Sequence, residues 1–133
     1  MSERAVIRVR EVMNERVEVI DGMATVSEAL HLMRDSGAEC LIVSKRHPDD
    51  EYGMLLISDV ARRVLGEDRA PQRVNVYEVM AKPVVSVEPE MDIRYCARLF
   101  TRFDLTRAPV IEQGEVIGIV SFSDLVLRGL CRF

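Results

Sequence analysis

Short apolar runs alternate along this chain with segments in which apolar residues recur at helical spacing, and the alternation occurs twice. The runs "VEVI" at 17–20 and "VVSV" at 84–87 have the length and the β-branched content of strands. Each run is followed by a segment that predicts an amphipathic helix, with apolar positions Val26, Ala29, Leu30 and Met33 in the first and Ile93, Cys96, Ala97 and Phe100 in the second. The pattern therefore predicts a strand followed by a helix in each half.

Polar residues mark where these helices begin. Thr25 opens "TVSE", which fits a capping box, and Asp92 precedes the second helix. Two more strands follow in each half, "CLIVS" and "YGMLLI" in the first and "APVIE" and "EVIGIV" in the second, and a short helix closes each half, "SDVARRVL" and "SFSDLVLRGL". We expect an α/β fold with mixed sheets, built from tandem β-α-β-β-α repeats.

The two halves are copies of each other. A shift of 67 residues pairs Met13 with Met80 and Leu32 with Leu99. The loop "SKRHPDDEY" is two residues longer in the first copy, and beyond it a shift of 65 pairs Asp59 with Asp124. We predict a first repeat at 1–66, a linker at 67–75 and a second repeat at 76–133. Because units of this size bury too little surface to be stable alone, we expect the copies to pack together.

Charge and hydropathy limit the classes of partner. The 133 residues carry a formal net charge of -4, and the sequence pI is about 5.3, so we expect no nucleic-acid partner. No apolar run approaches the roughly 18 residues that cross a bilayer, and the N-terminus lacks the apolar segment of a signal peptide. We expect a soluble, cytoplasmic protein without a membrane partner.

Metal and catalytic chemistry have little support in the sequence. Three cysteines without a C-x-x-C pair favour reduced, mostly buried thiols. His31 and His47 lack further ligands at suitable spacing, and the acids at 49–51 lack the glycine and spacing of a calcium loop. No Ser-His-Asp set, P-loop or G-x-G-x-x-G occurs. We therefore expect neither a metal site, nor a required cofactor, nor an enzyme.

A duplicated polar element stands at the start of each closing helix. "GIVSFSDL" at 118–125 has Gly, Ser, Ser and Asp where "GMLLISDV" at 53–60 has Gly, Leu, Ser and Asp. One interpretation is structural, because Ser121 can cap the helix with Asp124 as its capping-box partner. The other is functional, because a helix N-terminus suits a phosphate and a carboxylate suits the hydroxyls of a ribose. The residues alone leave both open.

The order of these elements, the "VM" before the first strand, the "TVSEALHLM" helix and the "APVIEQGEVIGIVSFSDL" run resemble the CBS domain, named for cystathionine beta-synthase. The resemblance covers about residues 12–130. It implies a regulatory pair of repeats, related by a pseudo-twofold axis, with two clefts between them. It also implies an adenosine-containing ligand, such as AMP, ADP, ATP or S-adenosylmethionine, and frequent dimerisation.

The resemblance also implies site residues, in two unequal clefts. The more complete site would use Gly118, Ser121, Ser123 and Asp124 with Glu18, Glu39 and Cys40 of the other copy. The weaker site would use Gly53, Ser58 and Asp59 with Val85, Thr106 and Arg107. Leu56 replaces the serine there. Arg107 would favour an anion, and Glu39 would disfavour phosphate at the site with Asp124.

Two hypotheses follow, from different classes. The first is a sensor that binds an adenosine-type ligand, forms a homodimer and relays occupancy to an unidentified protein. The second is a ligand-free interaction or oligomerisation module, in which the serine and aspartate are only caps. Arg94, Arg98 and Arg102 form a stripe at i, i+4 and i+8, which is either a solvated helix face or a docking surface for an acidic partner or the other subunit.

Overall fold

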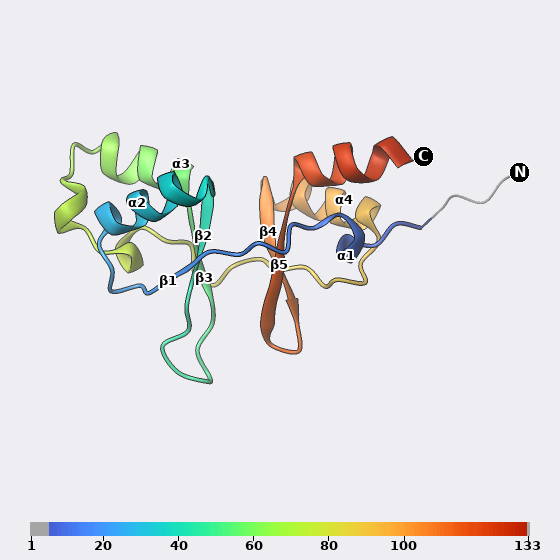
Figure 1. Ribbon diagram of the computed structural model, residues 1–133, viewed down its shortest axis with the longest axis horizontal. Coiled ribbons are helices and arrows are strands. Elements are labelled where there is room, and N and C mark those ends of the chain that lie inside the picture. The colour runs from blue at the N-terminus through green and yellow to red at the C-terminus, as the bar shows by residue number, and fades with distance from the viewer. Residues whose placement is uncertain (1–5, 133) are drawn as a thin grey trace, which may run out of the picture. The chain divides into compact units, whose positions relative to one another are not determined.

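The computed structural model describes residues 6–132 and contains two compact units (Figure 1). Unit 1 consists of residues 6–17 and 85–132, and unit 2 consists of residues 18–84. Each unit has its own sheet and its own apolar core. The α/β class with mixed sheets, predicted from the sequence, is confirmed.

Unit 2 contains a three-stranded sheet in the order β1-β2-β3. Strand β1 (Val19–Ile20) is parallel to β2 (Cys40–Val43), which is antiparallel to β3 (Gly53–Leu56). The helical elements of this unit are α2 (Val26–Ser36), α3 (Ile57–Val60), the π-helix η1 (Ala61–Leu65) and the 3-10 turns η2 (Pro71–Arg73) and η3 (Val76–Glu78).

Unit 1 repeats this plan with a two-stranded sheet, in which β4 (Arg107–Glu112) is antiparallel to β5 (Glu115–Ser121). Its helical elements are α1 (Val9–Val12), α4 (Ile93–Phe103), the π-helix η4 (Asp124–Gly129) and the 3-10 turn η5 (Leu130–Arg132). The strand predicted at 84–87 is reduced to a parallel bridge between Val87 and Val110. Pro83 and Pro89 flank it and cannot donate to a ladder, which limits the pairing.

The predicted helix starts are confirmed by their caps. Thr25 Oγ1 accepts a hydrogen bond from the Glu28 N–H (3.1 Å), and Asp92 Oδ1 accepts one from the Arg94 N–H (2.8 Å). Gly37 ends α2 in the left-handed conformation, with φ of 76°. The short polar side chains at both starts therefore satisfy N–H groups that the helices themselves leave free.

The segment at the start of each repeat packs on the other repeat. In unit 1, the Ile93 N–H donates to the Ile7 carbonyl and the Val9 N–H to the Met91 carbonyl, both at 2.9 Å. In unit 2, the same two bonds join Val26 to the Val74 carbonyl and Val76 to the Ala24 carbonyl, both at 2.8 Å. We call 7–13 and 74–80 the exchanged segments. In Figure 1 the first of them, with α1, runs beside the C-terminal helix of unit 1.

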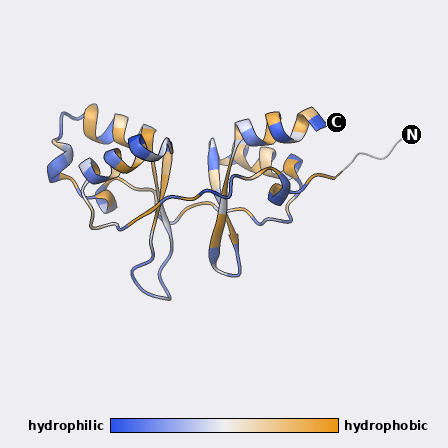
Figure 2. Cartoon of the chain, viewed as in Figure 1, coloured by the Kyte–Doolittle hydropathy of each residue, from blue (hydrophilic) through white to orange (hydrophobic). Residues whose placement is uncertain are grey.

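Each exchanged segment completes the core of its unit. Val9 and Val12 are fully buried beside Phe100 and Val120 in unit 1, and Val76 and Val79 are fully buried beside Leu41 and Leu55 in unit 2. The helices carry hydrophobic and hydrophilic residues on different faces, and the loop between β2 and β3 is hydrophilic (Figure 2). The apolar faces predicted from helical spacing thus lie in the cores.

The same close contact with a methionine explains one glycine in each unit. A Cβ atom on Gly118 would lie 2.7 Å from the Met13 Sδ and 3.0 Å from the Asn14 carbonyl oxygen, and one on Gly53 would lie 2.6 Å from the Met80 Sδ. The methionine of each exchanged segment therefore rests on a strand position that has room for no side chain.

The variant Gly118→Ala is expected to lower the free energy of unfolding by about 1–3 kcal/mol, because the added methyl group overlaps Met13 and a carbonyl fixed by the Asn14–Ile119 bridge. Urea denaturation of the purified variant measures this. Gly22→Ala is the control, since a Cβ there meets its neighbours at ordinary distances of 3.4 and 3.5 Å. Equal effects of the two variants would contradict the prediction.

Candidate functional site

Asp124 and Ser121 form a reciprocal cap at the start of the last helix of unit 1. Asp124 Oδ2 accepts hydrogen bonds from the Ser121 N–H (2.9 Å) and from the Ser121 hydroxyl (3.0 Å). The Asp124 N–H in turn lies 3.2 Å from the Ser121 Oγ, to which it donates. This is the structural interpretation of the G-x-x-S-x-x-D element, and it fixes where the carboxylate lies.

Unit 2 keeps half of this cap. The Leu56 N–H donates to Asp59 Oδ2 at 2.9 Å, the distance found for Ser121 and Asp124. Leu56 has no hydroxyl, so the two further bonds of Ser121 have no counterpart there. The two copies thus hold their carboxylates by the same backbone bond, and only unit 1 adds a hydroxyl to the group.

The cap leaves Asp124 with capacity to bind other donors. A carboxylate offers about four lone-pair sites, and the cap uses those of Oδ2. Oδ1 lies 3.9 Å from Arg128 Nη1, and the side chain is 20% exposed. Capping and the binding of a ligand hydroxyl are therefore compatible at this residue.

An arginine one helical turn after each aspartate fixes the exchanged segment. Arg128 Nη1 donates to the Met13 carbonyl at 3.1 Å, and Arg63 donates to the Val79 and Glu78 carbonyls, also at 3.1 Å. The sequence pairs these arginines as repeat equivalents but does not reveal what they bind, because their acceptors are backbone atoms far away in the chain.

The predicted neighbours from the second strands lie beside the caps of their own units. In unit 1, the Phe122 N–H donates to the Thr106 carbonyl (3.0 Å), and Arg107 is the strand partner of Ser121. In unit 2, the Ile57 N–H donates to the Glu39 carbonyl (3.1 Å), and Cys40 is the strand partner of Leu56. The combination of Glu39 and Cys40 with Asp124, or of Thr106 and Arg107 with Asp59, stays a prediction.

The other predicted site residues differ in exposure. Ser123 is exposed, and Ser58, Glu18 and Val85 are half-buried. The backbone carbonyl of Glu18 accepts a hydrogen bond from the Ile42 N–H at 2.9 Å. Gly53 and Gly118 are buried against Met80 and Met13, so packing within their units accounts for both glycines.

The three cysteines are free thiols, of which Cys40 and Cys96 are buried and Cys131 is exposed. Burial raises the pKa of Cys96 to about 12, which keeps this thiol protonated and unreactive.

Across residues 6–132, no group of three metal-ligating side chains gathers, and no helix has the length and apolar character needed to cross a membrane.

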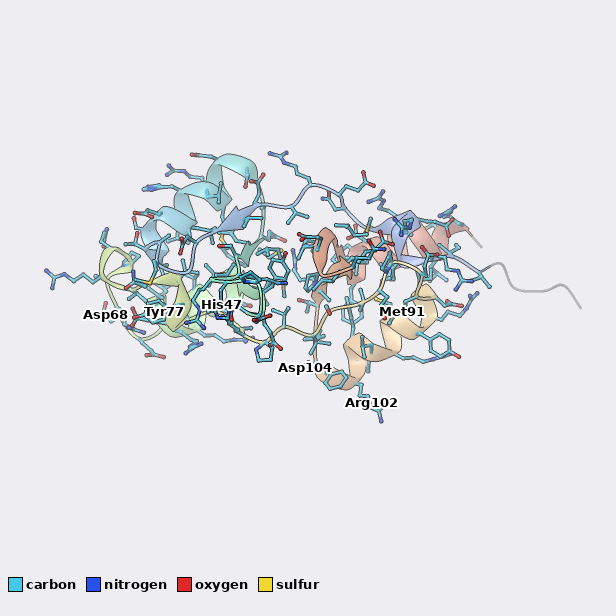
Figure 3. The ribbon with its side chains drawn as sticks, turned by 90° about the horizontal axis from the view of Figure 1, so that it is seen from below. His47, Asp68, Tyr77, Met91, Arg102 and Asp104 are labelled. Carbon is cyan, nitrogen blue, oxygen red and sulfur yellow. The ribbon has the colours of Figure 1, made fainter. Side chains whose placement is uncertain are left out.

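The arginine stripe on α4 is not uniform. Arg94 Nη1 lies 3.8 Å from Asp92 Oδ1, and the Arg98 guanidinium lies 5.3 Å from the ring centroid of Tyr95. Arg102 is exposed at the C-terminal end of α4 (Figure 3). Arg98 and Arg102 line an open groove of about 730 Å³, together with the acids Glu88, Glu90 and Asp92. Because acids and arginines line the groove together, its charge does not favour an acidic partner in particular.

The duplicated fold and the duplicated cap agree with the result of a family comparison. The CBS domain profile matches residues 9–66 and 76–129. The chain belongs to the CBS domain family. It is 29% identical to the CBS domain-containing protein YhcV of Bacillus subtilis over 120 residues, which are 90% of this chain and 84% of YhcV. It spans 58% and 59% of two uncharacterized relatives, from Methanopyrus kandleri and Methanocaldococcus jannaschii.

Solved structures of CBS proteins resemble the chain closely. The hexameric CBS-CP12 protein from bloom-forming cyanobacteria superposes with a TM-score of 0.91 at 40% identity, over 93% of this chain and 72% of that one. The CBS domain pair of MJ0100, in complex with 5'-methylthioadenosine and S-adenosyl-L-methionine, has a TM-score of 0.83 at 15% identity and covers 97% of this chain. At that identity the likeness to MJ0100 shows the fold alone.

Proposed function

We propose that this CBS pair is a regulatory module, without catalysis of its own, that binds an adenosine-containing ligand beside Asp124 and relays occupancy to a partner protein. The observation that carries the proposal is the Asp124 carboxylate, which the Ser121 cap positions at a helix start while Oδ1 retains acceptor capacity. A carboxylate in such a position can accept both hydroxyls of a ribose. The MJ0100 pair, which has the same fold, is in complex with two adenosyl compounds, and this supports the choice of ligand class.

The proposal includes unequal sites. Ser121 contributes a hydroxyl beside Asp124, whereas Leu56 contributes a methyl-tipped side chain beside Asp59. A phosphate or ribose oxygen near Asp59 would therefore find one donor fewer, so we expect the site with Asp124 to bind more tightly. Occupancy can shift a conformational equilibrium only through a difference in affinity between two states, so the response should follow this site.

The test is a thermal-shift and calorimetric titration of the parent chain with AMP, ADP, ATP, S-adenosylmethionine and 5'-methylthioadenosine. A ligand at about 100 times its Kd stabilises the folded state by about 2.7 kcal/mol, and we expect at least one of these compounds to do so. Asp124→Ala should raise the Kd of that compound at least tenfold and so reduce the stabilisation. The matched variant Asp59→Ala should raise the Kd less. Folded protein that binds none of the five compounds would overturn the proposal.

A specific surface favours the second candidate, an oligomerisation module. Val126 and Leu127 on η4 and Leu130 on the adjoining η5 are 45%, 67% and 59% exposed, which is unusual for large apolar side chains so close in sequence. The CBS-CP12 relatives of known structure are hexameric. We propose that this surface joins copies of the chain, as in a homodimer. Light scattering should report an oligomer for the parent and a monomer for Leu127→Glu, and a monomeric parent would contradict it.

A further inference from the structure

A pocket of about 340 Å³ lies in unit 2, at the base of the loop between β2 and β3. Its apolar walls are formed by Met23, Val43, Tyr77 and Met80. Met23 is 70% exposed and Tyr77 is 51% exposed, so two large side chains remain accessible around the cavity. Figure 3 shows Tyr77, with His47 of the loop, on the face of unit 2 that is seen from below. Accessible apolar side chains around a cavity of this size are typical of a small-molecule site.

The pocket is distinct from the candidate site at Asp59. In the ladder of β2 and β3, Cys40 pairs with Leu56 and Val43 pairs with Gly53. The cap of Asp59 is at the Cys40 end of this ladder, whereas Val43 and Ser44, which line the pocket, are at the other end. Three residues of strand separate the two places by about 10 Å.

Charged groups of both signs line this pocket. Arg46 and Lys82 are the cations of the lining. Both pair with Asp50, whose side chain is only 8% exposed and is not part of the lining. Asp50 Oδ2 lies 3.0 Å from Arg46 Nε, and Asp50 Oδ1 lies 2.9 Å from Lys82 Nζ. The hydrogen bonds from Arg46, with that from Lys82, keep the pKa of Asp50 well below its usual range, so the anchor stays ionised. Together these three groups leave one positive charge at the pocket.

A carboxylate stands in the turn before α2 on the same pocket. Asp21 lines the cavity, and its Oδ1 accepts a hydrogen bond from the Met23 N–H at 2.8 Å, which fixes the side chain. Its charge balances the one left by Arg46, Lys82 and Asp50. The lining therefore combines an apolar wall, two cations that share one counter-ion, and one carboxylate, which complements a neutral zwitterion with an apolar body better than it complements an anion.

Unit 1 has ion pairs at the equivalent place. The Tyr77 N–H donates to the Gly22 carbonyl, and the Arg10 N–H donates to the Pro89 carbonyl, both at 2.9 Å, so Arg10 is the counterpart of Tyr77. Arg10 Nε lies 3.0 Å from Glu90 Oε1, where Glu90 is the counterpart of Met23, and Arg10 also pairs with Glu112. Ion pairs thus link the residues that in unit 2 are the uncharged Tyr77 and Met23.

We propose that the pocket of unit 2 binds a free amino acid with an aromatic or other apolar side chain. The carboxylate of the ligand contacts Arg46 and Lys82, its ammonium group contacts Asp21, and its side chain packs on Met23, Tyr77 and Met80. The proposal uses none of the residues at Asp59 or Asp124, so it stands or falls independently of the adenosine ligand.

The test is an NMR titration of the isotope-labelled full chain with L-phenylalanine, and with phenylacetate and phenethylamine, which each lack one charge. L-phenylalanine should cause saturable shifts at the amides of Gly22, Ser44, Tyr77 and Lys82, and each analogue should bind at least tenfold more weakly. No saturable shift at about 10 mM L-phenylalanine would overturn the proposal, because such binding would be weaker than about 3 kcal/mol. Equal binding of phenylacetate would overturn the role of Asp21.

A double variant tests the location. Met23→Glu with Tyr77→Arg copies the ion pair of unit 1 into unit 2 and should weaken L-phenylalanine at least tenfold, while the dispersion of the spectrum reports that the fold is intact. Tyr95→Arg, at an exposed tyrosine of unit 1, is the matched control and should bind as the parent does. Lys82→Met provides a second variant and should weaken L-phenylalanine but not phenethylamine. Parent-like binding by both pocket variants would place the ligand elsewhere.

Discussion

Val12→Asp is expected to unfold the C-terminal repeat, although residue 12 lies in the N-terminal part of the chain. Val12 is fully buried in the core of unit 1, where it packs with Phe100 and Val120 of the second repeat. An ionised carboxylate placed there has no partner, and such burial costs several kcal/mol, a large share of the stability of a typical domain. The damage should therefore appear far from the substitution in sequence.

Hydrogen exchange followed by mass spectrometry measures this. Val12→Asp should increase exchange in peptides from 93–132 more than in those from 26–65. Val79→Asp is the matched variant, because Val79 is fully buried in unit 2 in the equivalent exchanged segment, and it should produce the opposite pattern. If each substitution loosened the repeat that contains it in sequence, the exchange of segments would be wrong.

Phe100→Ala is expected to lower the free energy of unfolding by about 3–5 kcal/mol, because it removes the largest fully buried side chain of the described residues. The Phe100 ring also packs edge-on against Phe122, with the ring centroids 5.2 Å apart and the planes at 70°. The cavity left behind lies between α4 and the sheet of unit 1, where helix and strands cannot collapse without losing other contacts.

Phe103 on the same helix provides the control for this prediction. It is 53% exposed, and Phe103→Ala should change the free energy of unfolding by no more than about 0.5 kcal/mol. Urea denaturation of both variants under one set of conditions measures the difference. A loss below about 1 kcal/mol for Phe100→Ala would mean that α4 does not pack as described.

Local signals in the sequence predicted the local parts of the fold. The hydroxyl of Thr25 and the carboxylate of Asp92 cap the helices that they were expected to open, and the "EQGE" turn joins β4 to β5. The strand expected at 84–87 is the exception. Its apolar pattern matches that of β1, but prolines on either side restrict pairing, and pattern alone does not weigh that cost.

Contacts between distant residues could not be predicted in this way. The exchange of 7–13 and 74–80 leaves no mark on periodicity, since Val12 and Val79 look like core positions whichever repeat they join. At the candidate site, the Ser121–Asp124 cap follows from spacing, whereas the carbonyl partners of Arg63 and Arg128 depend on the exchange. The pocket at Tyr77 could not be predicted from the sequence either. Its recognition depends on the pairing of Tyr77 with Arg10 as repeat equivalents and on the ion pair that Arg10 forms with Glu90.

The exchange of these segments also determines how the protein can be divided into folded fragments. A fragment cut between the repeats would carry a leading segment whose proper place is on the missing half, and its own helix would lack one. An autonomous half would require a permuted gene, in which 85–132 is followed by a linker and then 6–17. By the same logic, a single repeat with this connectivity would complete its core by exchanging its first segment with a second copy, as in a domain-swapped pair.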